Sequence, residues 1–194
     1  MTTPLLQSST VSLRPIEHTD LPLMYRLEND TTLWDTSNAV QPLSRTTIER
    51  FISAATNDIY TDRQLRLVIE EEGKASSSSV VGEAGPTLEE RERSGKALGF
   101  IDLTDFTPRH LRAEVGITLL PEHRGRGIGT EALRLLEQYA TQVLTIHQLY
   151  AYATPDSPSY SLFLSAGYHT AAILNDWVRV KGQYRPMAML QKVL

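Results

Sequence analysis

Hydrophobic and polar residues alternate over several short stretches of this chain, as in strands that bury one face. Val11 and Leu13 show the pattern, which ends at Pro15. The stretches predicted as strands are 10–14, 65–69, 98–103, 113–119, 148–154, 177–181 and 185–190, the last two forming a hairpin that turns at Gly182 and Gln183.

Other stretches repeat hydrophobic residues every three or four positions and predict amphipathic helices. The longest is 125–144, and the others are expected at 21–29, after Ser44, and at 158–166 before Gly167. Strands and helices thus follow one another as β-α-α-β-β-β-α-β-α-β-β. This order predicts one α/β (α+β) domain with a mixed sheet, spanning 1–194.

The segment 71–97 differs from the rest because it is rich in Ser, Gly and charged residues and has few bulky side chains. We expect a mobile loop between two strands, and favour a tolerated insertion over a functional lid. A short helix over 87–93 is the alternative, since Thr87 and Glu90 have the spacing of a capping box.

Composition narrows the class of protein. Lys and Arg number 19 against 23 Asp and Glu, and a net charge of −4 argues against a nucleic-acid binder. Cys is absent, which excludes a disulfide scaffold, a Cys zinc site and a Cys nucleophile, and is compatible with the cytoplasmic location that we expect. The five His are far apart in the sequence, so no metal site is predicted, and no run approaches the roughly 18 apolar residues of a membrane span.

The residues between strand 113–119 and the long helix carry the chemistry. They read Arg-Gly-Arg-Gly-Ile-Gly-Thr over 124–130. Glycines let a backbone turn tightly, and the free N–H groups of a helix N-terminus bind phosphate oxygens, so we interpret the turn as a pyrophosphate site. A P-loop lysine is missing, and Thr130 replaces the third glycine of a dinucleotide fingerprint. The alternative is a turn that merely starts a helix.

With this turn, the sequence resembles the GNAT superfamily of acetyl-CoA-dependent N-acetyltransferases. Arg124, Gly127 and Gly129 match its [R/Q]-x-x-G-x-[G/A] signature. The remaining matches are Leu13-Arg14-Pro15, Asp20-Leu21, the strand 113–119, Leu162-Phe163 and Ala166-Gly167-Tyr168. Glu28-Asn29-Asp30 and Trp34 resemble residues typical of the branch that acetylates polyamines and ribosomal-protein N-termini.

The resemblance implies a mostly antiparallel sheet with a splay between strands 113–119 and 148–154, which admits acetyl-CoA. An N–H of the first strand would polarise the thioester carbonyl. The residues expected to bind the coenzyme are Ile117, Thr118 and Leu119 along the pantetheine arm, Arg124, Gly125, Arg126, Gly127, Ile128, Gly129 and Thr130 around the pyrophosphate, and Asp156 and Phe163 at the positions of the family's usual Asn and Tyr.

Two residues are candidates for proton transfer. Glu114, on the strand beside the expected thioester, is the candidate base, with the alternative that it is a solvated residue facing Arg112. In the family, a Tyr usually donates a proton to the departing thiolate, but Phe163, which stands at that position here, cannot donate one. Tyr160, one helical turn earlier, is a substitute, with ordinary packing as its alternative, and water is another donor.

The acceptor amine would arrive as a cation. Glu28, Asp30 and Asp35 lie near the end of the first helix and would attract it, and Trp34 would add a cation–π wall. The alternative is a solvated helix end with a capping Asp. Trp177, in the late hairpin, is interpreted as a core or dimer contact.

Three functions follow as hypotheses: acetylation of a small amine, first of all a polyamine such as spermidine; acetylation of a protein or peptide N-terminus; and a non-catalytic acetyl-CoA-binding module, since Phe163 and Asp156 depart from the family pattern. We therefore expect an amine partner and a homodimer through the late hairpin, with no nucleic acid and no membrane.

Overall fold

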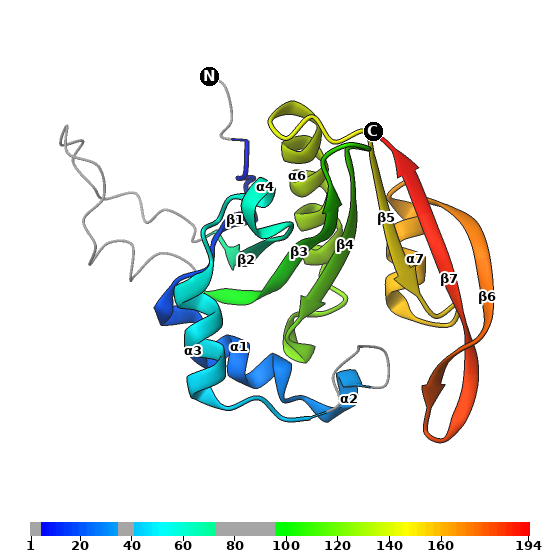
Figure 1. Ribbon diagram of the computed structural model, residues 1–194, viewed down its shortest axis with the longest axis horizontal. Helices are drawn as coiled ribbons and strands as arrows, with labels where there is room; N and C mark the ends of the chain where they lie inside the picture. The colour runs from blue at the N-terminus through cyan, green and yellow to red at the C-terminus, as the bar shows by residue number, and fades with distance from the viewer. Residues whose placement is uncertain (1–4, 35–40, 73–95) are drawn as a thin grey trace.

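The computed structural model describes residues 5–34, 41–72 and 96–194, which form a seven-stranded sheet with helices on both faces (Figure 1). The strands lie in the order β1-β2-β3-β4-β5-β7-β6, and every neighbouring pair is antiparallel except β4 and β5. They are β1 (Val11–Pro15), β2 (Leu65–Glu71), β3 (Ala97–Thr107), β4 (Arg112–Leu119), β5 (Gln148–Ala153), β6 (His169–Val180) and β7 (Gln183–Val193).

Two hydrophobic cores hold the helices against the sheet. The larger core packs α6 (Ile128–Gln142) and α7 (Pro158–Ser165) against one face, and the smaller packs α1 (Leu21–Glu28) and α3 (Arg45–Ala54) against the other. The remaining short elements are α2 (Thr31–Trp34), α4 (Ile59–Asp62), η1 (His18–Asp20) and η2 (Pro121–His123). None of the helices in the described ranges has the length and apolar character needed to cross a membrane.

The sheet opens between its two parallel strands. β4 and β5 pair only from Arg112 and Gln148 to Glu114 and Tyr150, although β4 continues to Leu119 and β5 to Ala153. Figure 1 shows the two strands side by side at one end and diverging toward the other. The unpaired part of β4 therefore keeps an edge that can bind an extended ligand, as the predicted splay requires.

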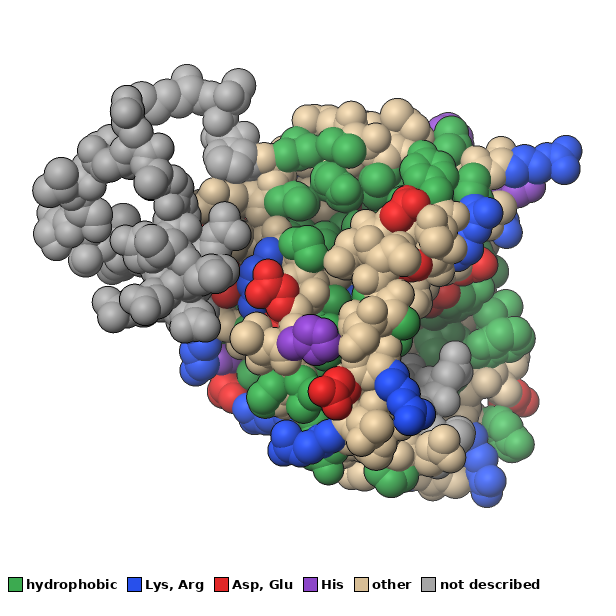
Figure 2. Space-filling model, turned by 60° about the vertical axis from the view of Figure 1, so that its left-hand side comes forward, with side chains coloured by type: hydrophobic (Ala, Val, Ile, Leu, Met, Phe, Trp, Pro, Cys, Tyr) green, Lys and Arg blue, Asp and Glu red, His purple; other side chains and the backbone are tan. Residues whose placement is uncertain are grey.

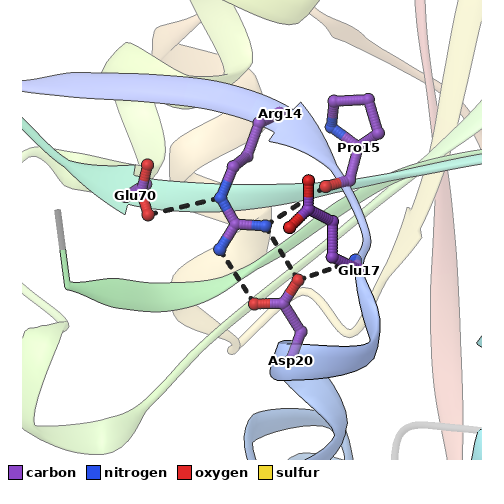
Figure 3. Close-up of polar contacts among 5 residues, drawn as sticks. All are labelled: Arg14, Pro15, Glu17, Asp20 and Glu70. Carbon is purple, nitrogen blue, oxygen red and sulfur yellow. Dashed lines mark hydrogen bonds and ion pairs between the residues drawn. The ribbon is translucent and has the colours of Figure 1, made fainter. Parts of the chain in front are cut away.

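A buried ion pair fixes the first helix to the sheet (Figure 3). The guanidinium of Arg14 on β1 donates to both carboxylate oxygens of Asp20, at 2.8 and 2.9 Å, and to Glu70 on β2 at 3.2 Å. Asp20 is buried, and its hydrogen bond with Arg14 is the main cause of a raised pKa for Arg14. This contact explains why Leu13-Arg14-Pro15 and Asp20 occur together at the start of the chain.

Several predicted boundaries differ from the structure. The long helix begins at Ile128 rather than 125, because Gly125 and Gly127 have left-handed φ angles of 70° and 77°. β3 continues to Thr107 through a bulge, and the hairpin strand β6 starts at His169 rather than 177. Most of the predicted insertion 71–97, including the alternative helix over 87–93, lies outside the described residues, as does Asp35.

Candidate active site

The glycine turn after β4 has the geometry of an anion site. Gly127 is the N-cap of α6, and a Cβ on Gly125 or Gly127 would have no atom within 4 Å, so the turn is open on its outer side. The first amides of α6 point out of the helix end and lack helical partners. With the positive end of the helix dipole, they suit pyrophosphate oxygens, so the turn fits the coenzyme that the sequence predicted.

The unpaired edge of β4 offers backbone groups to the pantetheine arm. The N–H of Leu120 donates to the Leu98 carbonyl at 2.9 Å, within the same register that pairs Phe100 with Thr118. Antiparallel ladders alternate, so the amide of Thr118 points to β3, and the amides of Ile117 and Leu119 point into the splay. Of the three predicted pantetheine residues, Ile117 and Leu119 direct their backbone amides toward the arm, whereas Thr118 directs its amide to β3.

A buried histidine, which the sequence interpretation missed, supports the turn. His123 in η2 is 5% exposed, and its Nδ1 lies 3.1 Å from a guanidinium nitrogen of Arg126. Arginine can only donate, so Nδ1 is the acceptor and Nε2 carries the hydrogen. Arg126 also donates to Glu71 at 3.0 Å, and Arg124 donates from Nε to the Leu119 carbonyl at 3.0 Å. Both arginines therefore lie beside the turn with N–H groups to spare.

The other predicted coenzyme residues lie on or near α6 and α7. Ile128 is buried in the larger core, and Thr130 is exposed at the helix start. A Cβ on Gly129 would touch side chains of Ile117, Leu119 and Leu162 at 3.5–3.7 Å, which is ordinary contact, so a methyl group has room there.

The remaining residues near α7 have other contacts. Phe163 is buried and packs at 62° against Tyr168, with 5.0 Å between ring centroids. The hydroxyl of Tyr160 lies 2.9 Å from that of Thr170 on β6, a contact that fits its packing alternative. Exposed Asp156 forms an ion pair with Arg185 on β7.

A pocket lies on the α1 side of the sheet, next to the unpaired part of β4. The pocket brings together Glu28, Trp34 and Thr118, which the sequence had named for different reasons. The indole N–H of Trp34 donates to the carbonyl of Glu28 at 3.0 Å and fixes the ring beside it. The lining residues are Leu27, Glu28, Leu33, Trp34, Arg66, Phe100, Asp102 and Thr118.

Two carboxylates share one guanidinium at the floor of this pocket. Arg66 on β2 donates to both oxygens of Asp102, at 2.9 and 3.0 Å, and to Glu28 Oε1 at 2.7 Å. Burial opposes the charge of Arg66, but Asp102 and Glu28 outweigh it and raise its pKa. The rings of Phe51 and Phe100 face the guanidinium at 5.5 and 5.2 Å. Burial raises the pKa of Asp102, which the charge of Arg66 opposes. The pocket thus holds two acidic side chains and one basic side chain.

Arg66 and Asp102 were also missed from the sequence. Each is a charged residue between two buried hydrophobic residues of a strand, which was the available signal. Asp30 has a different place: its carboxylate accepts from the N–H and hydroxyl of Thr32, at 3.0 and 2.7 Å, which lowers its pKa. This is the capping role given as the alternative for it.

Glu114 is the last β4 residue paired with β5 and lies at the beginning of the splay. Its carboxylate is partly buried and, within the described ranges, forms no ion pair with Arg112. Burial raises its pKa, and the negative charge of Asp105 raises it further. A carboxylate of raised pKa at this place is suited to accept a proton near neutral pH.

A thioester held along β4 and an amine held over Thr118 would meet where the sheet opens. This arrangement defines an acyl-CoA-dependent transferase that acts on an amine. A family model described as acetyltransferase (GNAT) domain matches residues 10–168, and the chain belongs to this family. It is therefore an acetyl-CoA-dependent N-acetyltransferase, as the resemblance predicted, and the enzyme is favoured over the non-catalytic binding module.

Several known proteins similar to this chain are spermidine N-acetyltransferases. Spermidine N(1)-acetyltransferase of Escherichia coli (strain K12) is 24% identical over 177 residues, covering 91% of this chain and 82% of its own. The crystal structure of spermidine N-acetyltransferase from Vibrio cholerae in complex with CoA and spermine has a TM-score of 0.74 at 19% identity, covering 96% of both chains. The dodecameric structure of the Vibrio cholerae enzyme in an intermediate state has a TM-score of 0.70 at 19% identity, covering 96% of this chain and 95% of that one.

Proposed function

We propose that this enzyme transfers the acetyl group of acetyl-CoA to a primary amine of a polyamine such as spermidine. The observation that carries the proposal is the surplus carboxylate of the pocket: Glu28 and Asp102 face one guanidinium, Arg66. Asp102 has both oxygens engaged by Arg66, while Glu28 shares only Oε1 with it. An ammonium group of the acceptor can therefore bind Glu28 without displacing Arg66 from Asp102.

The charge that selects the acceptor is local to this pocket. On the side of the molecule turned forward in Figure 2, acidic and basic side chains are interspersed, with no broad field of one sign. A cation that enters the pocket would be recognised by contact with Glu28 and with the ring of Trp34.

The shape of β4 suits an extended chain with amines at intervals. Thr118, Gly116 and Glu114 follow one another on the same face of the strand. Four residues at about 3.3 Å each place Thr118 roughly 13 Å from Glu114. Gly116 leaves the middle of this path without a side chain. One ammonium could thus bind in the pocket while a second amine lies over Gly116, between the pocket and the candidate base.

Acetyl-CoA supplies the acetyl group and the thiolate that leaves. Glu114 takes a proton from the reacting ammonium, directly or through water, which exposes the nitrogen lone pair. An amide of Ile117 or Leu119, pointing into the splay, polarises the thioester carbonyl. The new C–N bond forms as the C–S bond breaks, and the nitrogen then releases its remaining surplus proton to water to give the neutral amide.

The thiolate then requires a proton from a donor other than residue 163, where the family usually has Tyr. A thiol of ordinary pKa, about 8.5, is a moderate leaving group, so water can protonate it. Tyr160 stays the alternative donor that the sequence suggested. Its hydroxyl would have to leave Thr170 to serve this role.

The relatives also bear on assembly. The Vibrio cholerae enzyme forms a dodecamer, and we extend to this chain the expectation of a homodimer through the late hairpin. Trp177 and Tyr184 on β6 and β7 are 59% and 65% exposed, so Trp177 is outside the core and free to form such a contact.

The test is release of coenzyme A with spermidine, spermine and short peptides as separate acceptors. The chain has no Cys, so a thiol reagent reports only the liberated coenzyme. Release with the polyamines and not with peptides is expected. Release with peptides alone would move the assignment to N-terminal acetylation, and release with neither would refute both acceptors.

A further inference from the structure

β3 bulges at the point where it passes the candidate base. Thr104 pairs with Glu114, but the next pair is Thr107 with Arg112, so β3 carries one extra residue there. The extra residue of the bulge is accommodated at Asp105, whose φ of 47° is left-handed. Bulges turn side chains away from the regular alternation of a strand and are frequent beside active sites. Phe106 is buried in the core, whereas Asp105 is exposed.

A tyrosine of the opposite strand holds the Asp105 carboxylate. The hydroxyl of Tyr150 on β5 donates to Asp105 Oδ2 at 2.5 Å, and Tyr150 is 8% exposed. Tyr150 is also the direct partner of Glu114 in the short paired part of β4 and β5. Three adjacent strands therefore bring Asp105, Glu114 and Tyr150 together where the sheet begins to open. Burial, and then the bond to Asp105, raise the pKa of Tyr150, so it stays protonated and continues to donate.

Neither Asp105 nor Tyr150 takes part in the steps of acetyl transfer described so far. Their hydrogen bond spans the site from β3 to β5, and it places a second carboxylate beside Glu114. Arg112 lies two residues before Glu114 on the same strand, Asp102 lies two residues from its β3 partner Thr104, and Tyr152 lies two residues from its β5 partner Tyr150. Asp102 is bound by Arg66, and Tyr152 packs edge-on against Tyr150 with 5.9 Å between ring centroids.

We propose that Asp105 is a positioning residue of the acetyl transfer, acting through its negative charge on Glu114 and held in place by Tyr150. The inference rests on the proposed role of Glu114 as the base. Its physical content is that two neighbouring carboxylates resist being ionised together, so the proton of the incoming ammonium is accepted more readily by Glu114. Burial already favours the protonated form of Glu114, and Asp105 adds to this effect.

The test replaces Asp105 with Asn, which removes the charge and keeps the shape. Asn adopts left-handed backbone angles as readily as Asp, and its carbonyl can still accept from Tyr150, so the fold is expected to survive. Asp176→Asn is the matched control, because Asp176 is also exposed and has a φ of 52°, but lies on the edge strand β6. Tyr150→Phe removes the hydroxyl that holds Asp105 and gives a second, independent variant.

The readout is the pH profile of kcat/KM with spermidine. Activity requires ionised Glu114, so its titration sets the acidic limb of the profile. Removing the Asp105 charge lowers the pKa of Glu114, so the limb of D105N moves to lower pH and this variant is faster than wild type on the acid side. Y150F is expected to show part of the same shift, and D176N none. The titration of the substrate amine is common to all four proteins and cancels in the comparison.

A second measurement needs no turnover. Carbon-detected NMR follows the side-chain carboxyl of Glu114 with pH, with E114Q identifying the signal, and the midpoint is expected at lower pH in D105N than in D176N. A wild type that acetylates no amine would refute the proposed function, and the NMR midpoints would then still decide the effect of Asp105 on Glu114. An active wild type with the same acidic limb and midpoint in D105N would overturn the role of Asp105 alone.

Discussion

Replacement of Glu28 by Gln tests the acceptor pocket with a change of charge and almost none of shape. The Gln carbonyl can still accept from Arg66, which keeps its two hydrogen bonds to Asp102, at 2.9 and 3.0 Å. The fold is therefore expected to be retained. What changes is the side chain at position 28, from a carboxylate to an uncharged amide, so a bound ammonium loses its ionic partner.

The size of the effect follows from the exposure of the pair. A hydrogen bond to a charged group contributes about 1.5–3 kcal/mol when it is shielded from water. The Glu28 side chain is 29% exposed, so we take the lower end, about 1.5 kcal/mol, which is roughly a tenfold rise in the KM for spermidine. The KM for acetyl-CoA is expected to stay constant, because the coenzyme binds at the turn and the splay.

The assay is the initial rate of thiol release at varied spermidine and saturating acetyl-CoA. Glu49→Gln is the matched control, since Glu49 is an exposed carboxylate on α3 and does not line the pocket. An unchanged KM for spermidine in E28Q would refute the assignment of this pocket to the acceptor. A parallel rise in the KM for both substrates would point to a general distortion instead.

Three further predictions concern the frame of the site. Arg14→Ala leaves the buried carboxylate of Asp20 without its ion pair and should cost about 3 kcal/mol of unfolding free energy in urea denaturation; a loss below about 1 kcal/mol would show that water replaces the guanidinium. Gly99→Ala places a Cβ 2.1 Å from a backbone carbonyl of β4, so it should destabilise by about 3 kcal/mol and raise the KM for acetyl-CoA; an unchanged melting temperature would contradict the close approach. Gly127→Ala, at a φ of 77°, should lower the free energy of unfolding by about 1–2 kcal/mol and weaken coenzyme binding measured by calorimetry. Gly129→Ala, where the added Cβ has contacts of 3.5 Å and more, should leave the melting temperature unchanged. Equal effects of the two substitutions would argue against a special backbone at 127.

The regular part of the fold could be predicted from the sequence because its residues are half-buried. The alternation of Leu65, Leu67 and Ile69 is the inner face of β2, and the stripe that starts at Ile128 is the inner face of α6. The first half of β6 was missed because it lies at the edge of the sheet and is mostly exposed, so it has no buried face to impose alternation.

The site could be predicted only where local backbone chemistry defines it. The glycine turn is such a case, because left-handed angles at Gly125 and Gly127 require those residues. The pairing of Arg66 with Asp102 and Glu28 depends on which strand lies next to which, over separations of 36 and 38 residues. Asp105 is a similar case, since its direction follows from a bulge that one strand alone does not reveal.

The most direct test of the account is mass spectrometry of the product after incubation of the enzyme with acetyl-CoA and an equal mixture of spermidine and a short peptide. The proposed function and the assignment of the Glu28 pocket together predict monoacetylated spermidine and an unmodified peptide. They also predict that E28Q gives a strongly reduced yield of acetylated spermidine when the spermidine concentration is low. Acetylation of the peptide N-terminus with unmodified spermidine would contradict the account and assign the acceptor site to a polypeptide.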